Sequence, residues 1–297
     1  RLPGCAADLG LPDMAPLEAA EAGAGTMVIG VAPVGGALPG AWVDHCVAAL
    51  EAGLDLAAGL HSRLKDIPAI AEAAARTGRA VHDVRVPPEG LPCGTGRPRA
   101  GRRVLTVGTD CAVGKMFTAL ALERELRARG HAADFRATGQ TGILISGAGV
   151  PIDAVVADFL SGSVEVLAPA AAPDHWDLIE GQGSLFHPAY AAVSLGLLHG
   201  AQAGSLVLCH QLTRTHIDGD YAGYALPDLA TAAEANLAAA RLTSPNVRLA
   251  GVSLNSSRLP AEDAAERMAA ISAELGVPAV DPVRTGVGPL VDALEES

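Results

Sequence analysis

The chain has 297 residues, of which 49% are apolar and only 3% aromatic, so its core must be built mainly from Ala, Val, Leu and Ile. A disordered chain is excluded, because the apolar fraction is high and only 18% of the residues are charged. The net charge of −12 argues against a nucleic-acid partner, since no surplus of Lys and Arg exists to neutralise phosphates. The length predicts two domains or one large α/β domain that buries its core without staples.

The cysteines are five in number, widely spaced and without a C-x-x-C pair: Cys5, Cys46, Cys93, Cys111 and Cys209. This spacing disfavours a disulfide framework and a structural zinc site. We therefore expect reduced thiols in a cytoplasmic protein.

Membrane insertion is not expected. The stretch 181–213 carries no Asp, Glu, Lys or Arg, but His, Gln, Pro and Gly interrupt it before an apolar run of about 18 residues can form. Residues 1–4 lack the apolar segment of a secretory signal. Because the chain does not begin with Met, we expect that upstream residues are missing from it.

The first part of the chain alternates short apolar runs with helical patterns. The expected strands are 26–32, 54–59 and 80–86, and the expected helices are 41–52 and 67–77. Strands and helices that alternate at this spacing predict a small parallel α/β domain over residues 1–92.

A stretch rich in Pro and Gly follows at 87–102, and we take 93–102 as the linker between two domains. From residue 103 the alternation resumes. The expected strands are 104–107, 132–137, 176–179, 205–209, 249–254 and 277–283. The expected helices are 115–129, 152–160, 189–198, 230–242, 261–275 and a short one from 288. This pattern predicts a larger, doubly wound parallel sheet over 103–297.

A glycine-rich loop lies between the first strand and the first helix of this second domain. A strand–loop–helix context with a Gly-Lys pair is typical of a phosphate-binding loop, in which backbone N–H groups and the helix N-terminus face an anion. The residues expected to bind phosphate are Gly108, Thr109, Asp110, Cys111, Ala112, Val113, Gly114, Lys115 and Met116. Only two lysines occur in the chain, and Lys115 is one of them.

Met116 occupies the position where such loops usually place Ser or Thr. The missing hydroxyl is the usual Mg²⁺ ligand, and a thioether does not replace a hard oxygen donor. The loop is therefore expected to hold a phosphate ligand without a metal. The spelling G-T-D-x-x-V-G-K resembles the dethiobiotin-synthetase-like branch of P-loop proteins.

Polar side chains follow several predicted strands, at the sheet edge where ligands of parallel sheets bind. The residues that we expect at this edge are Arg136, Gln140, Thr141, Glu180, Arg214, His216, Asn255 and Arg284. Carboxylate and imidazole groups are candidate general bases, and arginines are candidate carboxylate ligands. Each has an ordinary structural alternative: Glu180 as a helix cap, and Arg214 and Arg284 as partners of Asp218 and Asp281.

Four longer strings, at 107–116, 136–145, 177–188 and 281–286, resemble the D-glutamate N-acetyltransferase family of P-loop proteins. The resemblance extends over nearly the whole chain. It implies a small Rossmann-like α/β domain followed by a larger P-loop NTPase-like domain. It also implies acetyl-CoA as the acetyl donor and a D-amino acid, typically D-glutamate, as the acceptor.

On this resemblance we expect the phosphate loop to hold a CoA phosphate, with Lys115 also acting in catalysis and Asn255 near the adenine. Glu180 or His216 would take the amine proton. The substrate would be bound by Arg136, Gln140, Thr141, Arg214 and Arg284.

Two other functions remain open at this stage. One is an ATP-dependent ligase or kinase related to dethiobiotin synthetase, and the other is a nucleotide-binding scaffold without turnover. For the transferase we expect a small-molecule substrate, no nucleic-acid or membrane partner, no metal and a homo-oligomer.

Overall fold

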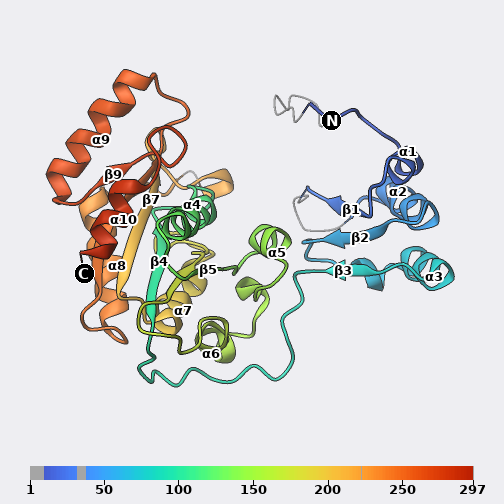
Figure 1. Cartoon of the computed structure of the whole chain (residues 1–297), viewed down its shortest axis with the longest axis horizontal. Coiled ribbons are helices and arrows are strands. Elements are labelled where there is room, and N and C mark those ends of the chain that lie inside the picture. Colours follow the sequence, from blue (N-terminus) through green and yellow to red (C-terminus); the bar gives the residue numbers. More distant parts are fainter. Residues whose placement is uncertain (1–9, 32–37, 222, 297) are drawn as a thin grey trace. The chain divides into compact units, whose positions relative to one another are not determined.

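The computed structural model describes residues 10–31, 38–221 and 223–296. The chain divides into two compact units, Arg1–Val86 and Pro87–Ser297, each with its own core (Figure 1). Cys5 and the end of the first expected strand, at residue 32, lie outside the described residues.

Unit 1 is a small parallel sheet with helices packed against it. The sheet has the order β1-β2-β3, formed by β1 (Thr26–Ile29), β2 (Asp55–Ala58) and β3 (Val81–Asp83). The helical segments are α1 (Pro16–Glu21), α2 (Gly40–Glu51), the 3₁₀ turn η1 (Leu64–Asp66) and α3 (Pro68–Thr77). Leu50, Leu56 and Ile70 are fully buried between the sheet and the helices. The architecture is the Rossmann-like α/β unit expected from the sequence.

The Pro/Gly-rich stretch expected to be a linker is bonded to unit 2. Glu165 accepts hydrogen bonds from the backbone N–H groups of Thr95 and Gly96, and Arg99 donates to the carbonyl oxygen of Gly200 at 2.7 Å. The stretch 93–102 has no helical or strand periodicity, and hydrogen bonds to residues distant in the sequence hold it in place.

Unit 2 is a parallel sheet of six strands in the order β5-β6-β4-β7-β8-β9. The strands are β4 (Arg102–Gly108), β5 (Ala133–Arg136), β6 (Trp176–Ile179), β7 (Ser205–Gln211), β8 (Arg248–Asn255) and β9 (Ala279–Val280). The α-helices are α4 (Lys115–Ala128), α5 (Gln140–Ser146), α6 (Ala157–Leu167), α7 (Ala191–Ala201), α8 (Leu229–Arg241), α9 (Ala261–Leu275) and α10 (Gly288–Glu295). Two 3₁₀ turns, η2 (Ile152–Ala154) and η3 (Gly219–Tyr221), lie in the connections.

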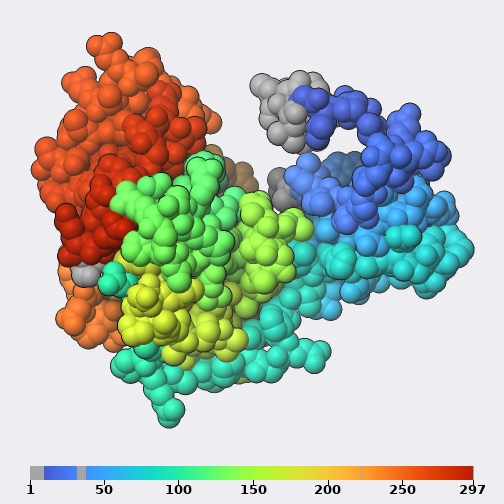
Figure 2. All heavy atoms as spheres, viewed as in Figure 1, coloured from blue at the N-terminus to red at the C-terminus, as the bar shows by residue number. Residues whose placement is uncertain are grey.

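Alternate side chains of the central strands pack on opposite faces of this sheet. Val104 and Val207 contribute to the core under α4 and α10, whereas Leu105 and Leu206 contribute to the core under α6, α7 and α8. This period of two, with both faces apolar, is what a buried parallel strand requires. Helix α9 covers the β8–β9 edge, and its outer side forms part of the surface of unit 2 in Figure 2. The doubly wound P-loop architecture predicted from the sequence is confirmed.

Three expected elements differ clearly from those observed. The strand expected at 80–86 forms only over Val81–Asp83. Helix α6 begins at Ala157 and not at 152, because 152–154 form a separate 3₁₀ turn. The last strand is only the pair Ala279–Val280, next to β8, and Pro282 shortly after it has no N–H to donate to a ladder. Within the described ranges, no helix has both the length and the apolar character to cross a membrane.

Candidate active site at the phosphate loop

The phosphate loop connects the end of β4 to the start of α4. Its backbone has two left-handed residues, Ala112 with φ of 52° and Gly114 with φ of 106°. The αL conformation at a non-glycine residue is uncommon and costs on the order of 1–2 kcal/mol, so its presence here points to a functional constraint. Left-handed residues in such a loop turn successive N–H groups toward one point, where they form an anion-binding nest.

Lys115, the first residue of α4, lies within the loop and is 6% exposed. Its Nζ donates a hydrogen bond of 2.7 Å to the carbonyl oxygen of Asp110. Burial lowers the pKa of Lys115, and the neighbouring Cys111, Asp110 and Glu180 oppose that shift. The ammonium group is thus held in position inside the loop before any ligand arrives.

Asp110 and Arg214 fix the loop to the end of β7. One carboxylate oxygen of Asp110 accepts from Nη1 of Arg214 at 2.8 Å and from the backbone N–H of Asp218 at 3.0 Å. The other accepts from the backbone N–H of Cys111. Arg214 also donates to the carbonyl oxygen of Cys111 and to the side chains of Gln211 and Asp218. Its guanidinium therefore braces the loop, as in the structural alternative considered from the sequence.

A cavity of about 500 Å³ opens beside the loop. Its walls come from three segments: the loop and first turn of α4 (111–117), the start of α5 (139–141) and the segment that follows β6 (180–183). Gln140, Thr141 and Gln182 supply amide and hydroxyl groups to this wall. Lys115 is the sole cationic side chain among the described lining residues.

Glu180 is the acidic group of this cavity. Its Oε2 accepts hydrogen bonds from the backbone N–H groups of Thr138 and Gly139, at 2.9 and 3.0 Å. Its Oε1 accepts none within the described part of the chain, and the residue lines the cavity. Burial raises the pKa of Glu180, against the opposing effects of the two N–H groups and of Lys115. A Cβ on Gly142 would collide with the carboxylate, so that glycine allows α5 to approach.

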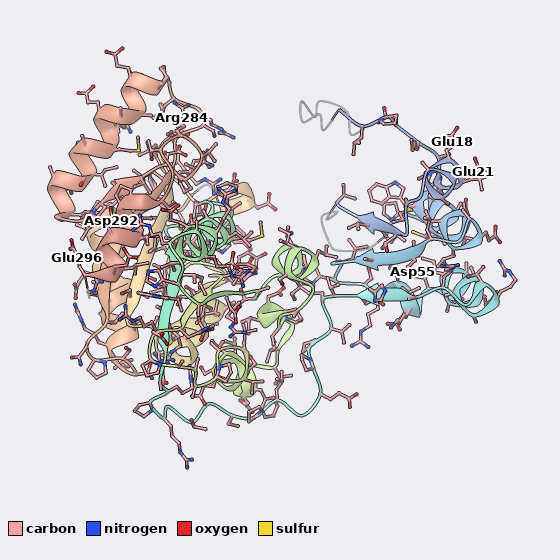
Figure 3. The ribbon with its side chains drawn as sticks, viewed as in Figure 1. Glu18, Glu21, Asp55, Arg284, Asp292 and Glu296 are labelled. Atoms are coloured by element: carbon pink, nitrogen blue, oxygen red, sulfur yellow. The ribbon has the colours of Figure 1, made fainter. Side chains whose placement is uncertain are left out.

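A second cavity, of about 300 Å³, lies on the other side of the loop. Gly114 and Phe117 line both cavities. Asn255 at the end of β8 and Arg284, in the loop between β9 and α10 (labelled in Figure 3), line the second one. Arg284 donates to the carbonyl oxygens of Ser256 and Leu259, so it is partly engaged. Asn255 and Arg284 therefore line the same cavity, whereas Glu180 lines the other one.

Met116 leaves the helix start without a hydroxyl group, and Thr118 does not replace it. The Oγ1 of Thr118 is bonded to the carbonyl oxygen of Gly114 at 2.9 Å and to Oγ of Ser253 at 2.7 Å. This hydroxyl is therefore engaged in hydrogen bonds within the protein, and Thr118 is only 1% exposed.

Three of the strand-end candidates line neither cavity: Arg214, described above, and Arg136 and His216. Arg136 pairs with Asp177 at 2.7 Å and with Asp134 at 3.2 Å, on the wall of another cavity. His216 is exposed, and its ring lies 3.0 Å from the hydroxyl of Thr215. Neither lines the cavity of Glu180 or that of Asn255.

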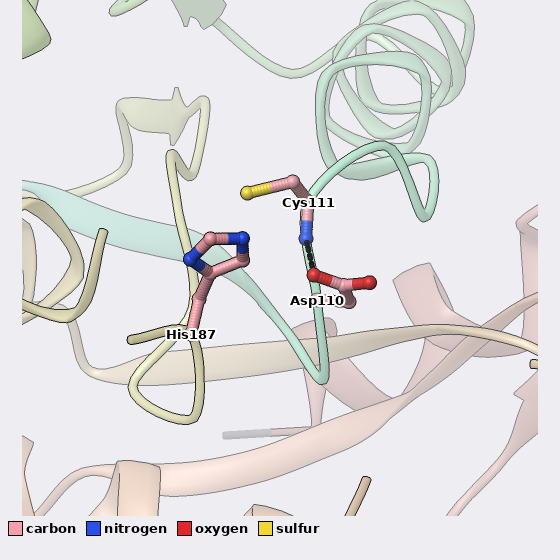
Figure 4. Close-up of side chains that lie close together, drawn as sticks. All are labelled: Asp110, Cys111 and His187. Carbon is pink, nitrogen blue, oxygen red and sulfur yellow. Dashed lines mark hydrogen bonds between the residues drawn. The ribbon is translucent and has the colours of Figure 1, made fainter. Parts of the chain in front are cut away.

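The structure adds His187 to the site, a residue that the sequence presented as one histidine among nine. Figure 4 shows its ring facing the sulfur of Cys111, with Asp110 on the same side. One side-chain ligand atom from each of the three residues lies within 4.8 Å of the others. The string of residues 177–188 contains His187, but its position beside Cys111 depends on how the chain folds.

Among the described residues, two groups of side chains have the chemistry of metal ligands. The first is Asp110 with Cys111 and His187, and the second is Asp134 with His175 and Asp177. In the first, both oxygens of Asp110 already accept hydrogen bonds. In the second, Arg136 occupies both carboxylates. The carboxylates of both groups are therefore engaged by other groups of the protein.

Comparison with known proteins places the chain in a family. A family model described as "Domain of unknown function (DUF1611_C) P-loop domain" matches residues 92–291, and its counterpart, "Domain of unknown function (DUF1611_N) Rossmann-like domain", matches residues 1–87. The chain belongs to the DUF1611 family. A crystal structure of a DUF1611 family protein from Anabaena variabilis is similar, with 38% identity, a TM-score of 0.87 and coverage of 95% of this chain and 82% of that chain.

Two curated DUF1611 relatives carry the name D-glutamate N-acetyltransferase. The protein from Tritonibacter scottomollicae is 52% identical over 99% of this chain and 88% of its own length. The protein from a Pseudoalteromonas species is 46% identical over 97% of this chain and 86% of its own length. The chain is therefore an enzyme, an acyltransferase with an N-acetyltransferase role.

Proposed function

We propose that this DUF1611 enzyme transfers the acetyl group of acetyl-CoA to the amine of a D-amino acid, with D-glutamate as the acceptor. The observation that carries the proposal is a phosphate loop without a hydroxyl at Met116 that borders both the cavity of Glu180 and the cavity of Asn255. The names of the two curated relatives support the acceptor.

The donor suits the loop by charge, and the two cavities on either side of the loop offer room for its two ends. The diphosphate of CoA would bind the backbone N–H groups of the nest and Lys115. Its adenosine would enter the cavity of Asn255 and Arg284, and the pantetheine arm would run past Gly114 into the cavity of Glu180. A diphosphate that is bound and not hydrolysed has no need of the Mg²⁺ ligand that Met116 lacks.

The amine must lose a proton before it can attack the acetyl carbonyl. Glu180 suits this step, because the residue lines the cavity, Oε2 is fixed by Thr138 and Gly139, and Oε1 accepts no hydrogen bond from the described residues. Its raised pKa brings the carboxylate closer to the pH at which a general base works best. Gln140, Thr141 and Gln182 would orient the acceptor by hydrogen bonds, since Arg136 and Arg214 are held in ion pairs.

The proposal is tested with the purified chain, acetyl-CoA and a panel of D- and L-amino acids, following the release of free CoA thiol. We expect thiol release and an N-acetylated product with D-glutamate, and little with L-glutamate. ATP, Mg²⁺ and the same panel form the matched arm. ADP release there, without thiol release from acetyl-CoA, would contradict the proposal and favour a ligase or kinase.

A further inference from the structure

Cys111 is the one thiol among the described residues that lines the cavity of Glu180. It follows Asp110 and precedes Ala112, whose left-handed backbone turns the chain sharply at this point. Cys46 and Cys209 are buried elsewhere, and Cys93 is exposed. The sulfur of Cys111 is thus presented to the space in which the acetyl group of the donor would lie.

His187 is oriented toward this sulfur by contacts on its other side. Its Nδ1 accepts a hydrogen bond of 3.1 Å from the backbone N–H of Ala189. The ring packs against Tyr190 and Tyr221, with centroids 4.4 and 4.7 Å away. Because Nδ1 is an acceptor, the ring hydrogen of the neutral imidazole is on Nε2. Figure 4 shows the ring nitrogen nearest the sulfur of Cys111 on the side opposite to the one bonded to Ala189.

The Nε2–H of His187 has no hydrogen-bond acceptor within the described ranges, although the residue is only 4% exposed. The nitrogen itself is accessible, so it is free to donate a hydrogen bond to a ligand group that lies next to Cys111. Asp110 does not serve, because Cys111, Arg214 and Asp218 engage its oxygens. A carbonyl oxygen of a group attached to Cys111 would lie within reach.

We propose that Cys111 is the nucleophile that accepts the acetyl group, and that the Nε2–H of His187 donates a hydrogen bond to the carbonyl oxygen of that group. The inference rests on the proposed function, since acetyl-CoA is the donor in both. It replaces direct attack of the amine on acetyl-CoA by two successive acyl transfers.

In the first transfer, the Cys111 sulfur attacks the carbonyl carbon of acetyl-CoA. A carbon–sulfur bond to Cys111 forms, the carbon–sulfur bond to CoA breaks, and the thiol proton passes to the departing CoA thiolate. In the second, the neutral amine attacks acetyl-Cys111 and the carbon–sulfur bond breaks. The amine proton passes through Glu180 to the Cys111 sulfur, which restores the thiol.

Electrostatics at Cys111 predict how the first transfer depends on pH. Burial raises the pKa of the thiol, while the charges of Lys115 and Arg214 lower it and Asp110 adds to the rise. The thiol is therefore largely protonated at neutral pH. The rate of enzyme acetylation is expected to rise as the pH increases and the thiolate forms.

The test is to incubate the full chain with acetyl-CoA and a chelator in the absence of any amine, stop the reaction in acid and measure the intact mass. One added acetyl group, located on Cys111 by peptide mapping and discharged by D-glutamate, is the expected result. The C93S variant, which removes the exposed thiol outside the site, is expected to behave as the wild type. C111A is expected to show no acetylation and to lose at least about 10²-fold in kcat with donor binding retained.

His187 is tested by two replacements. H187A is expected to slow both transfers by about 10²–10³-fold with little change in donor binding, as for other oxyanion donors. H187Q, whose side-chain amide can donate a hydrogen bond, is expected to recover part of that loss. A merely structural histidine would show equal losses in both variants.

The outcomes separate this inference from the proposed function. Active acetyl transfer without acetyl-Cys111, together with C111A activity within about threefold of the wild type, would overturn the inference and leave the proposed function standing. Acetyl-Cys111 that D-glutamate does not discharge would support the nucleophile and contradict the acceptor. Neither acetyl-enzyme nor product would contradict both.

Discussion

At the scale of single residues, the site depends on a few buried polar side chains that form hydrogen bonds with the protein backbone. Glu180 receives two N–H groups, Lys115 donates to a loop carbonyl, and His187 accepts from Ala189. Backbone contacts thus orient all three side chains; Glu180 and Lys115 line the cavity, and His187 faces the sulfur of Cys111. Such fixed orientation is what preorganised catalysis requires.

The first residue-scale prediction concerns Glu180. E180Q keeps the shape of the side chain and removes its ability to take a proton, so kcat is expected to fall by about 10²–10⁴-fold while donor binding changes little. In the wild type, the acidic limb of the rate profile is expected to lie above the ordinary pKa range of glutamate, because burial raises the pKa of Glu180. Steady-state rates across pH measure both.

E262Q is the matched control for this prediction, because Glu262 is exposed in the first turn of α9. Its rates are expected to follow those of the wild type. An E180Q variant with unchanged kcat would show that another group takes the amine proton.

The candidate site illustrates which features are visible in the sequence. Gly114 and Lys115 are predictable because a strand, a loop and a helix follow one another locally. The ion pair of Arg136 with Asp177 is not, because it requires β5 and β6 to be neighbours although the two residues are 41 positions apart. His187 and Cys111 likewise come together only in the folded sheet.

At the scale of elements, the ends of neighbouring strands carry the site and hold it together. The sequence predicts the long elements well, since α9 has a helical period of 3.6 and β7 contains the continuous apolar run 206–209. Helix α5 was not predicted, because seven residues with a glycine inside show no helical period. The connection after β7 reaches the phosphate loop through Arg214, so loop and strand end form one bonded unit.

The Asp110–Arg214 pair gives the first prediction at this scale. Removing one partner of a buried ion pair leaves the other uncompensated, so R214A and D110A are each expected to lower the free energy of unfolding by about 3–5 kcal/mol. The double variant is expected to lose less than the sum, which a double-mutant cycle measures by denaturant unfolding. Losses that simply add would show that the two residues act separately.

His210, near the end of β7, gives a second prediction, on pH. Burial, together with the charge of Arg214, lowers the pKa of His210 to about 4, and its Nδ1 lies 2.8 Å from the hydroxyl of Thr109. The unfolded chain, with a histidine pKa of about 6.5, then binds more protons than the native state between these values. Stability is therefore expected to fall as pH decreases from about 6.5 to about 4, by up to about 3 kcal/mol from this residue.

H210Q removes the titration and keeps a polar side chain next to Thr109. The slope of its unfolding free energy against pH is expected to be smaller than that of the wild type in this window, by chemical denaturation. H82Q replaces an exposed histidine of β3 and serves as the control. Equal slopes in all three proteins would contradict the prediction.

At the scale of the whole molecule, the chain is two units with separate cores, and the site described above lies within unit 2. Each unit is large enough for cooperative unfolding of its own, so a single unfolding transition is not assumed. The two tryptophans of the chain divide between the units: Trp42 is on α2, and Trp176 is the first residue of β6. Each can therefore report on one unit.

Ligand binding to unit 2 is expected to shift one of two unfolding transitions. CoA at about 100 times its Kd is expected to raise the free energy of unfolding of the unit that binds it by about 2.7 kcal/mol. The reason is that a ligand bound only to the native state stabilises it by an amount that grows with the ratio of ligand concentration to Kd. The W42F variant leaves Trp176 as the reporter, and the W176F variant leaves Trp42. We expect CoA to raise the midpoint of the Trp176 transition and to leave that of Trp42 unchanged in denaturant titrations.

Because Trp176 is 2% exposed and packs under the guanidinium of Arg102, its emission is sensitive to the opening of β6. Equal shifts of both reporters would show that the two units unfold together, and no shift of either would contradict the binding of CoA to the folded chain.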